Sequence, residues 1–209
     1  MRDLISAWEQ KTGYMADLIT GSSGKLTAQI LSGAPYDLFI SADRKYLERL
    51  TKDEHITDSI TTIAYGQLAY VWSGSSLGYE EVLSDATYIA IANPDVAPYG
   101  KSAFSYLNDH SLYDSDRSKL IYGENVAQVY QYVVSGAAEI GLTALSLVVN
   151  SQHHDVEWLR VQGEYQLVEQ SAGILTSSSL QEEAKSFISY MKSSEASQIL
   201  ESYGYLPHR

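Results

Sequence analysis

The first candidates for chemistry in this 209-residue chain are short turns rich in glycine and serine. Gly21-Ser22-Ser23-Gly24 follows an apolar run and precedes a stretch with helical spacing. The unpaired backbone N–H groups at a helix start favour an anion there, and serine hydroxyls add donors without adding charge. A serine at this place is equally typical of a helix N-cap, so the local sequence leaves both interpretations open.

Two further turns lead from an apolar run into a helix in the same way. Residues 93–100 contain two of the four prolines of the chain. Proline fixes φ and Gly100 lets the backbone pass closely, so this turn can present the N–H groups of Tyr99 and Gly100. Asn125 precedes a helical stretch that begins at Val126. An ordinary strand-to-helix loop and a helix cap remain the alternatives for these two turns.

Enzymatic interpretations of the first turn depend on spacing. Ser22 and Lys25 satisfy the S-x-x-K motif of penicillin-recognising enzymes, in which the lysine assists the serine. The accompanying motifs do not fit, because Lys-Thr-Gly at 11–13 precedes the serine and Ser-Asp-Asn does not occur. A serine acyl-transfer enzyme that uses Ser22 and Lys25 is therefore a remote alternative, and we expect a protein that is not an enzyme.

Metal chemistry has one candidate, the run His153-His154-Asp155. Adjacent residues point apart on any regular element, and the sequence places no third ligand nearby, which favours a solvated loop. We therefore expect no cofactor and no metal that is coordinated directly by side chains. The acidic residues are scattered and form no evident pair for glycosidase-type acid and base catalysis.

Composition limits the partners. The chain has 14 Lys and Arg against 26 Asp and Glu, a formal net charge of −12, and no cysteine. This charge disfavours nucleic acid and acidic membranes as partners, and the lack of cysteine excludes disulfides, thiolate–zinc sites and thiol catalysis. No apolar run reaches the length of a membrane span and no signal-like segment opens the chain, which predicts a mature soluble globular protein.

The elements that must position these turns alternate between helix and strand about every 20 residues, as in βα units with a mostly parallel sheet. Helical spacing opens the chain at Met1–Trp8, and Gly13 ends that helix. Strands are predicted at Tyr14–Ile19, Asp37–Ser41, Leu68–Trp72, Tyr88–Ala92, Leu120–Tyr122, Ile140–Thr143 and Ser171–Leu175. Further helices are predicted around Leu26–Leu31, Tyr46–Leu50, Gly100–Leu107, Val126–Val134, Leu180–Met191 and Ser194–Glu201.

Together these segments resemble a known protein family. Residues 21–30 and the run Gly-Ala-Pro-Tyr-Asp-Leu-Phe-Ile-Ser-Ala-Asp at 33–43 resemble the periplasmic molybdate-binding proteins of bacterial molybdate ABC transporters. Residues 93–100, 124–126 and 203–205 match in the same order, so the resemblance covers essentially the whole chain. The first two segments together are specific to this family, and each of the others is weak evidence for the resemblance by itself.

The resemblance implies an α/β, two-lobed type II periplasmic-binding-protein fold, each lobe a mostly parallel sheet flanked by helices. Lobe one would comprise residues 1–72 and 177–209, and lobe two residues 73–176, with crossovers near 70–75 and 171–177. It also implies a periplasmic, solute-binding component that captures molybdate or tungstate between the lobes by neutral hydrogen bonds and delivers it to a membrane permease. A binding protein for another tetrahedral oxyanion, such as sulfate, is the alternative.

The resemblance assigns the ligands by position. Ser23 would donate its hydroxyl and its N–H, Tyr99 its backbone N–H, and Val126 the N–H at the start of its helix. Ser22 and Asn125 flank these contacts.

Two departures from the family pattern matter. Ala144 stands where many relatives place a tyrosine whose hydroxyl binds the anion. Relatives also begin with a strand and a ligand serine ahead of the helix that opens this chain, so the first strand of lobe one is expected to be missing here. Losing one set of donors to a dianion costs about 1.5–3 kcal/mol of binding free energy. We therefore expect this chain to bind molybdate or tungstate more weakly than a full-length relative. A monomer is expected, with a strand-swapped oligomer as the alternative.

Overall fold

A computed structural model of the chain describes residues 1–57, 60–74, 77–111, 117–149, 151 and 156–208. The chain forms two compact units, which are treated separately below. Unit 1 comprises Met1–Tyr65 and Glu169–Arg209, and unit 2 comprises Gly66–Val168. Among the described residues, none of the helices has both the length and the hydropathy of a membrane-spanning segment.

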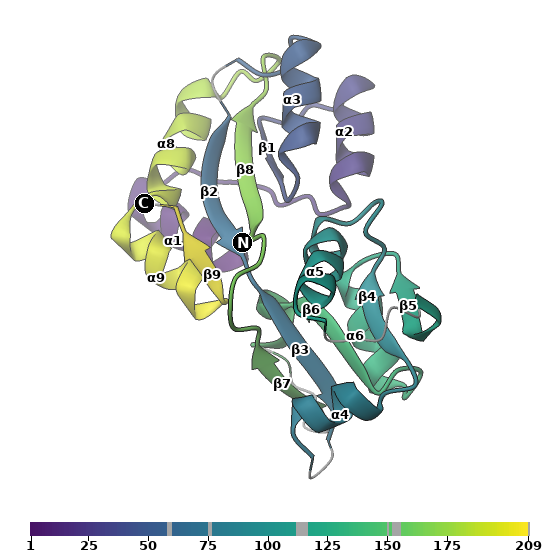
Figure 1. Ribbon diagram of the computed structural model, residues 1–209. Helices are drawn as coiled ribbons and strands as arrows, with labels where there is room; N and C mark the ends of the chain where they lie inside the picture. The colour runs from purple at the N-terminus through teal and green to yellow at the C-terminus, as the bar shows by residue number, and fades with distance from the viewer. Residues whose placement is uncertain (58–59, 75–76, 112–116, 150, 152–155, 209) are drawn as a thin grey trace. The chain divides into compact units, whose positions relative to one another are not determined.

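Unit 1 is a sheet with helices on both faces (Figure 1). Its strand order is β1-β8-β2-β9, and β1 runs antiparallel to β8 from Leu38↔Ile174 to Ser41↔Ser171. Its elements are α1 (Arg2–Thr12), α2 (Ser23–Leu31), β1 (Leu38–Ser41), α3 (Arg44–Lys52), β2 (Thr61–Gly66), β8 (Val168–Ile174), α8 (Gln181–Met191), α9 (Ser194–Ser202) and β9 (Tyr205–Pro207).

The alternation of side chains along β1 explains the two helical layers of unit 1. Phe39 is buried with Ile30 of α2 and Leu47 of α3. Leu38 and Ile40 point to the other face, where they pack against the cluster formed by α1, α8 and α9. Both faces of β1 are therefore covered by helices, and α2 is fixed to one side of β1 through α3.

Unit 2 is a five-stranded sheet in the order β5-β4-β6-β3-β7. The pairs β4–β5 and β4–β6 are parallel, and β3 runs antiparallel to both β6 and β7. Its elements are β3 (Leu68–Ser73), α4 (Tyr79–Asp85), β4 (Ile89–Ala92), α5 (Pro98–Asp109), the 3₁₀ turn η1 (Arg117–Lys119), β5 (Leu120–Gly123), α6 (Val126–Val134), β6 (Ile140–Ala144), α7 (Leu145–Val148) and β7 (Val156–Arg160). The sheet is thus mixed, because parallel neighbours need crossover connections and α5 and α6 supply these only among β4, β5 and β6.

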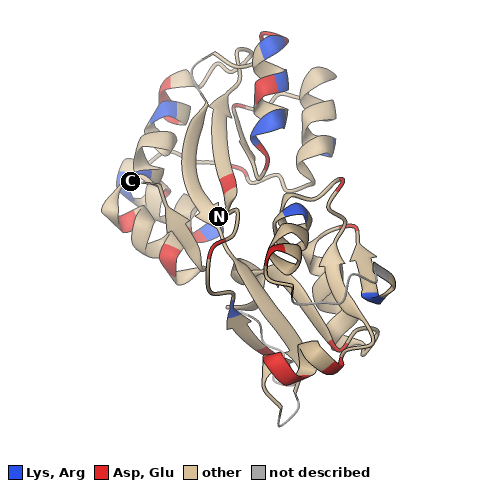
Figure 2. Cartoon of the chain, viewed as in Figure 1, with Lys and Arg blue, Asp and Glu red and all other residues tan. Residues whose placement is uncertain are grey.

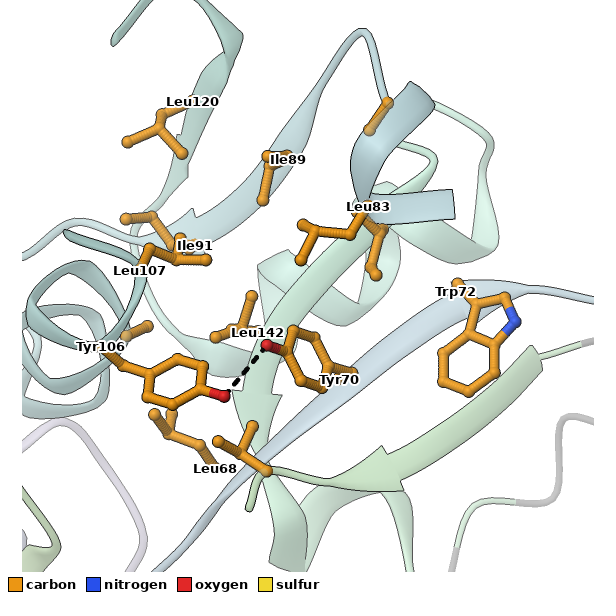
Figure 3. Close-up of a cluster of buried hydrophobic side chains, with 14 residues drawn as sticks. Leu68, Tyr70, Trp72, Leu83, Ile89, Ile91, Tyr106, Leu107, Leu120 and Leu142 are labelled. Atoms are coloured by element: carbon orange, nitrogen blue, oxygen red, sulfur yellow. Dashed lines mark hydrogen bonds between the residues drawn. The ribbon is translucent and has the colours of Figure 1, made fainter. Parts of the chain in front are cut away.

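One face of the unit 2 sheet carries a hydrophobic core in which Tyr70, Trp72 and Tyr106 lie among aliphatic side chains (Figure 3). The hydroxyl of Tyr70 in β3 donates to the hydroxyl of Tyr106 in α5 at 3.3 Å, and Tyr106 donates to the carbonyl of Gln162 at 3.3 Å. Burial, followed by the hydrogen bond to Tyr106, raises the pKa of Tyr70 far above its ordinary value. This core ties α5 to the strand that opens the unit.

Most predicted elements are confirmed to within a few residues. Helix α6 has the predicted bounds, and the runs predicted as strands at Asp37–Ser41, Tyr88–Ala92, Leu120–Tyr122 and Ile140–Thr143 are β1, β4, β5 and β6. Gly13 ends α1 in the left-handed conformation, with φ of 75°. No pattern in the sequence predicted β2, α4, α7, β7 or β9, and the last four of these elements are short.

The strand predicted at Tyr14–Ile19 is wrong. These residues have no regular secondary structure, and Met15 and Ile19 are 83% and 56% exposed. A strand is stable only when a neighbour completes its hydrogen bonds. In the described part of the chain β1 lies at the edge of its sheet with β8 as its one partner, so this apolar segment has no strand beside it.

The two units divide a few residues before the boundaries expected from the sequence. The chain passes from unit 1 to unit 2 between Tyr65 and Gly66, and returns between Val168 and Glu169. Strand pairing explains the difference. Residues 68–72 pair with β6 and so belong to unit 2, whereas residues 171–174 pair with β1 and so belong to unit 1.

Candidate functional site

The carboxyl ends of β4, β5 and β6 meet at one edge of the unit 2 sheet, because these strands are parallel. Ala92 lies opposite Gly123 at the ends of β4 and β5, and the N–H of Asn93 donates to the carbonyl of Gly123 at 2.7 Å. Helices α5 and α6 begin a few residues further on. The structure therefore brings together two of the turns singled out in the sequence, 93–100 and 124–126, at the edge where α/β sheets bind ligands.

The start of α5 is built over the end of β4. The carbonyl of Asn93 accepts from the N–H of Ala97 at 2.9 Å, and Ala97, the N-cap residue, provides no side-chain cap. Pro98 is the first helical residue and has no N–H, so the first donors of the helix are those of Tyr99 and Gly100. A Cβ on Gly100 would lie 2.1 Å from the carbonyl oxygen of Ala92, so only glycine allows this approach.

The start of α6 combines a cap with unused donors. The side-chain oxygen of Asn125 accepts from the N–H of Gln128 at 3.0 Å. Within the described residues the N–H groups of Val126 and Ala127 find no acceptor. Thr143 of β6 donates its hydroxyl to the carbonyl of Val126 at 2.9 Å and so holds the turn in place. The cap and the anion-binding interpretations of this turn are thus compatible.

The start of α2 in unit 1 repeats this arrangement. The hydroxyl of Ser22 accepts from the N–H of Lys25 at 3.4 Å, which makes Ser22 the N-cap. Ser23 accepts a hydrogen bond from Thr27 with its carbonyl. In the part of the chain that the structure describes, the Ser23 hydroxyl and the N–H groups of Ser23 and Gly24 have no acceptor. Ser22 therefore shapes the turn, and Ser23 offers the donors.

Charge distinguishes these three helices from most of the others. Asp or Glu occupies the first turn of α1, α4, α8 and α9, and Asp43 caps α3, where the carboxylates offset the positive end of the helix dipole. The first turns of α2, α5 and α6 contain no acid. In Figure 2 no red is visible on α2, whereas the neighbouring α3 carries both colours. A bound anion would take the place of those carboxylates.

Ala144 ends β6 at the same edge of the unit 2 sheet. It is 3% exposed, and its backbone lies opposite Leu68 of β3. The next N–H, that of Leu145, donates to the carbonyl of Gln67 at 2.8 Å. A methyl group offers no hydrogen bond, so this position adds no side-chain donor to the edge.

Sequence reasoning did not identify Thr143 as a residue that shapes the site. Its strand was predicted, but the partner of its hydroxyl lies 17 residues earlier in the chain, at Val126. The one signal was a threonine at the end of a strongly apolar strand, and this signal is weak because threonine is common in strands.

The described residues contain no cluster of three or more His, Asp or Glu side chains that could hold a metal ion. His153, His154 and Asp155 lie outside the described residues. In the S-x-x-K motif the Ser22 hydroxyl accepts the Lys25 backbone N–H, a capping bond, and the Lys25 side chain is exposed.

Comparison with known proteins gives consistent results. The family described as bacterial extracellular solute-binding protein matches residues 1–206. The molybdate-binding protein ModA of Azotobacter vinelandii is 34% identical over 214 residues, which cover 98% of this chain and 84% of that protein. ModA of Rhodobacter capsulatus is 28% identical over 210 residues, covering 98% and 82%. The structure of the Azotobacter vinelandii periplasmic molybdate-binding protein superposes with a TM-score of 0.82 at 30% identity, covering 100% of this chain and 94% of that one.

Proposed function

Because the chain belongs to the family of bacterial extracellular solute-binding proteins, we propose that it captures molybdate or tungstate and delivers it to the membrane permease of an ABC transporter. Relatives named as molybdate-binding proteins match 98% of the chain. They are binding proteins, and we infer that this chain likewise binds its ligand without transforming it. The Azotobacter vinelandii relative is described as periplasmic, and we assign the same compartment to this protein.

The observation that carries the proposal is the set of helix starts without first-turn acids, α2 in unit 1 and α5 and α6 in unit 2. Ser23 contributes a hydroxyl and an N–H, and Tyr99 and Val126 contribute backbone N–H groups. All these donors are neutral. A dianion without protons can accept from all of them, whereas a protonated phosphate oxygen would need an acceptor, and the backbone N–H groups of this set offer none.

Ser22 and Asn125 have a supporting role in this proposal. Each uses its side-chain oxygen to accept the N–H of the residue three positions on, Lys25 and Gln128. Each thereby leaves the first two N–H groups of its helix for the anion. Ala144 supplies no hydroxyl. Backbone donors therefore carry a larger share of the binding at the unit 2 edge than they would if a tyrosine stood at this position.

A thermal-shift panel tests the function. Molybdate, tungstate, sulfate and phosphate are added at matched ionic strength, and only a ligand of the native state raises the melting temperature. We expect molybdate and tungstate to stabilise the protein, by about 2.7 kcal/mol at a concentration 100 times Kd. A larger shift with sulfate would assign the chain to a different oxyanion, and no shift with any anion would overturn the proposal.

A further inference from the structure

Glycine is required at position 66 by the lack of space for a side chain and not by the backbone conformation. It closes β2, it is buried, and it is not among the glycines with positive φ, which are Gly13, Gly33, Gly136, Gly163 and Gly204. A Cβ built on Gly66 would lie 1.9 Å from the phenolic oxygen of Tyr99 and 2.8 Å from its Cζ. Real Cβ atoms essentially never come within 3.0 Å of another atom. A side chain at 66 and the present position of the Tyr99 ring therefore exclude each other.

Gly66 also occupies a special place in the chain, because it is the first residue of unit 2 after Tyr65 of unit 1. The short connection from Gly66 to β3 is held inside unit 2. The carbonyl of Gln67 accepts from the N–H of Leu145 at 2.8 Å, and the N–H of Leu68 donates to the hydroxyl of Tyr165 at 3.2 Å. Tyr99, which lies on Gly66, follows β4, and Leu145, which donates to Gln67, follows β6. These two contacts therefore come from the edge of the sheet that carries the candidate site.

The first turn of α5 depends on such contacts. Ala97 gives it no side-chain cap, unlike Ser22 in α2 and Asn125 in α6. Its position is set instead by Gly100 against the end of β4 and by the Tyr99 ring against Gly66. A Cβ at residue 66 would overlap the Tyr99 ring much more deeply than a Cβ at Gly24 would overlap Tyr46, with 1.9 Å against 3.3 Å to the phenolic oxygen. The Tyr99 ring must then either turn about its side-chain bonds or displace the first turn of α5, and the second response would move the N–H groups of Tyr99 and Gly100.

We propose that the side chain of Tyr99 is a positioning residue. Its phenol lies on Gly66 and fixes the first turn of α5, and the connection between the two units thereby sets the affinity of the unit 2 donors for the oxyanion. This inference rests on the proposed function. It adds a role for the Tyr99 side chain, beyond its backbone N–H, and a role for Gly66, which has no donor directed at the ligand in this scheme.

A double-mutant cycle tests the proposal, because groups in contact give non-additive effects. Molybdate affinity is measured by titration calorimetry for wild type, Gly66→Ala, Tyr99→Ala and the double variant. We expect Gly66→Ala alone to bind at least tenfold more weakly. In the Tyr99→Ala background the same change should alter Kd by less than threefold, because the ring is gone while the backbone N–H of residue 99 remains.

Gly78→Ala is the matched control. Gly78 lies in the same unit with φ of −71°, and a Cβ there meets nothing within 4 Å, so we expect wild-type affinity. Wild-type affinity of Gly66→Ala, or equal losses from Gly66→Ala in both backgrounds, would overturn the proposal. If Gly66→Ala alone does not fold, Tyr99→Ala is compared with the double variant: equal affinities support the proposal, and a further tenfold loss overturns it.

A measurement without ligand separates this inference from the proposed function. Gly66→Ala should shift the ¹⁵N–¹H resonances of Gly100 and Lys101 in the ligand-free protein, and in the Tyr99→Ala background the same change should leave them in place. If the wild type fails to bind molybdate while these shifts occur, the proposed function falls and the positioning role stands. If it binds and Gly66→Ala leaves these resonances unchanged, the positioning role falls.

Discussion

The two units offer the same chemistry on different supports. In unit 2 the donors of α5 and α6 follow parallel strands, and the loops between them are tied by hydrogen bonds such as Asn93 to Gly123. In unit 1 the donors of α2 follow residues 14–19, which form no strand, and α2 is held by packing on α3. Donor position therefore rests on backbone contacts in unit 2, with Tyr99 and Thr143 as additional side-chain supports, and on side-chain packing in unit 1. The donors of the two units should respond differently to mutation.

The largest effect is expected from adding one methyl group to each helix start. In Gly100→Ala the new Cβ would lie 2.1 Å from the backbone oxygen of Ala92, which cannot move without the sheet. In Gly24→Ala it would lie 3.3 Å from the hydroxyl of Tyr46, the far end of a flexible side chain. We expect Gly100→Ala to weaken molybdate binding about 100-fold, since overpacking against a rigid partner displaces the donors at a cost of about 1–3 kcal/mol.

Gly24→Ala should change Kd by less than about fivefold, since a shift of the Tyr46 ring relieves the contact. Titration calorimetry gives the affinities, and thermal melts show whether each variant is folded. Similar losses at the two glycines would mean that both units hold their donors in the same way, contrary to the comparison.

The next largest effect separates the two serines of unit 1. Ser23→Ala removes a hydroxyl proposed to donate to a dianion, a contact worth about 1.5–3 kcal/mol, so Kd should rise about 10- to 100-fold with the melting temperature unchanged. Ser22→Ala removes the cap of α2 and should cost about 1 kcal/mol of stability. The measurements are a molybdate titration and a thermal melt of each variant. Unchanged affinity of Ser23→Ala would remove this hydroxyl from the site.

A smaller effect is expected at Thr143 in unit 2, which acts on the site through the carbonyl of Val126. Thr143→Val keeps the shape of the side chain and removes a hydrogen bond worth about 0.5–1.5 kcal/mol, so a loss of affinity of a few fold is expected. Thr143→Ser keeps the hydroxyl and should retain most of the affinity in the same titration. Equal weakening in both variants would show that packing, and not the hydrogen bond, matters at this position.

The contrast between the units also marks what the sequence can predict. The density and spacing of apolar residues predicted β1, β4, β5 and β6, since apolar side chains of each of these strands pack with helices in a hydrophobic cluster. The same signal was misleading at 14–19, because a strand also needs a neighbour and the pattern carries no information about one. At Ser22 and Ser23 the sequence left a cap and an anion site open. The geometry identifies Ser22 as the cap, and the role of Ser23 as a donor to the anion remains our proposal.

Contacts between distant positions were beyond prediction from sequence. The approach of Tyr99 to Gly66 joins residues 33 positions apart, and neither residue type signals it. Gly100 was predicted to allow a close backbone approach, and this is confirmed by the position of Ala92. Local sequence thus located the helix starts, whereas their supports depend on how the strands of each unit are paired.

The smallest effect concerns acid stability, which should be centred on unit 1. Burial raises the pKa of Glu169, but hydrogen bonds from Ser171, Thr62 and Arg44, with the charge of Arg44, outweigh it and hold this pKa below its ordinary value. A carboxyl whose pKa is lowered on folding stabilises the protein above its unfolded pKa, and this contribution is lost as pH falls through the folded value. The melting temperature of wild type should therefore fall between pH 6 and pH 3 by a few degrees more than that of Glu169→Gln. An equal fall in the melting temperature of both proteins would mean that the Glu169 carboxylate adds no stability through these hydrogen bonds. Acid sensitivity would then not distinguish unit 1 from unit 2.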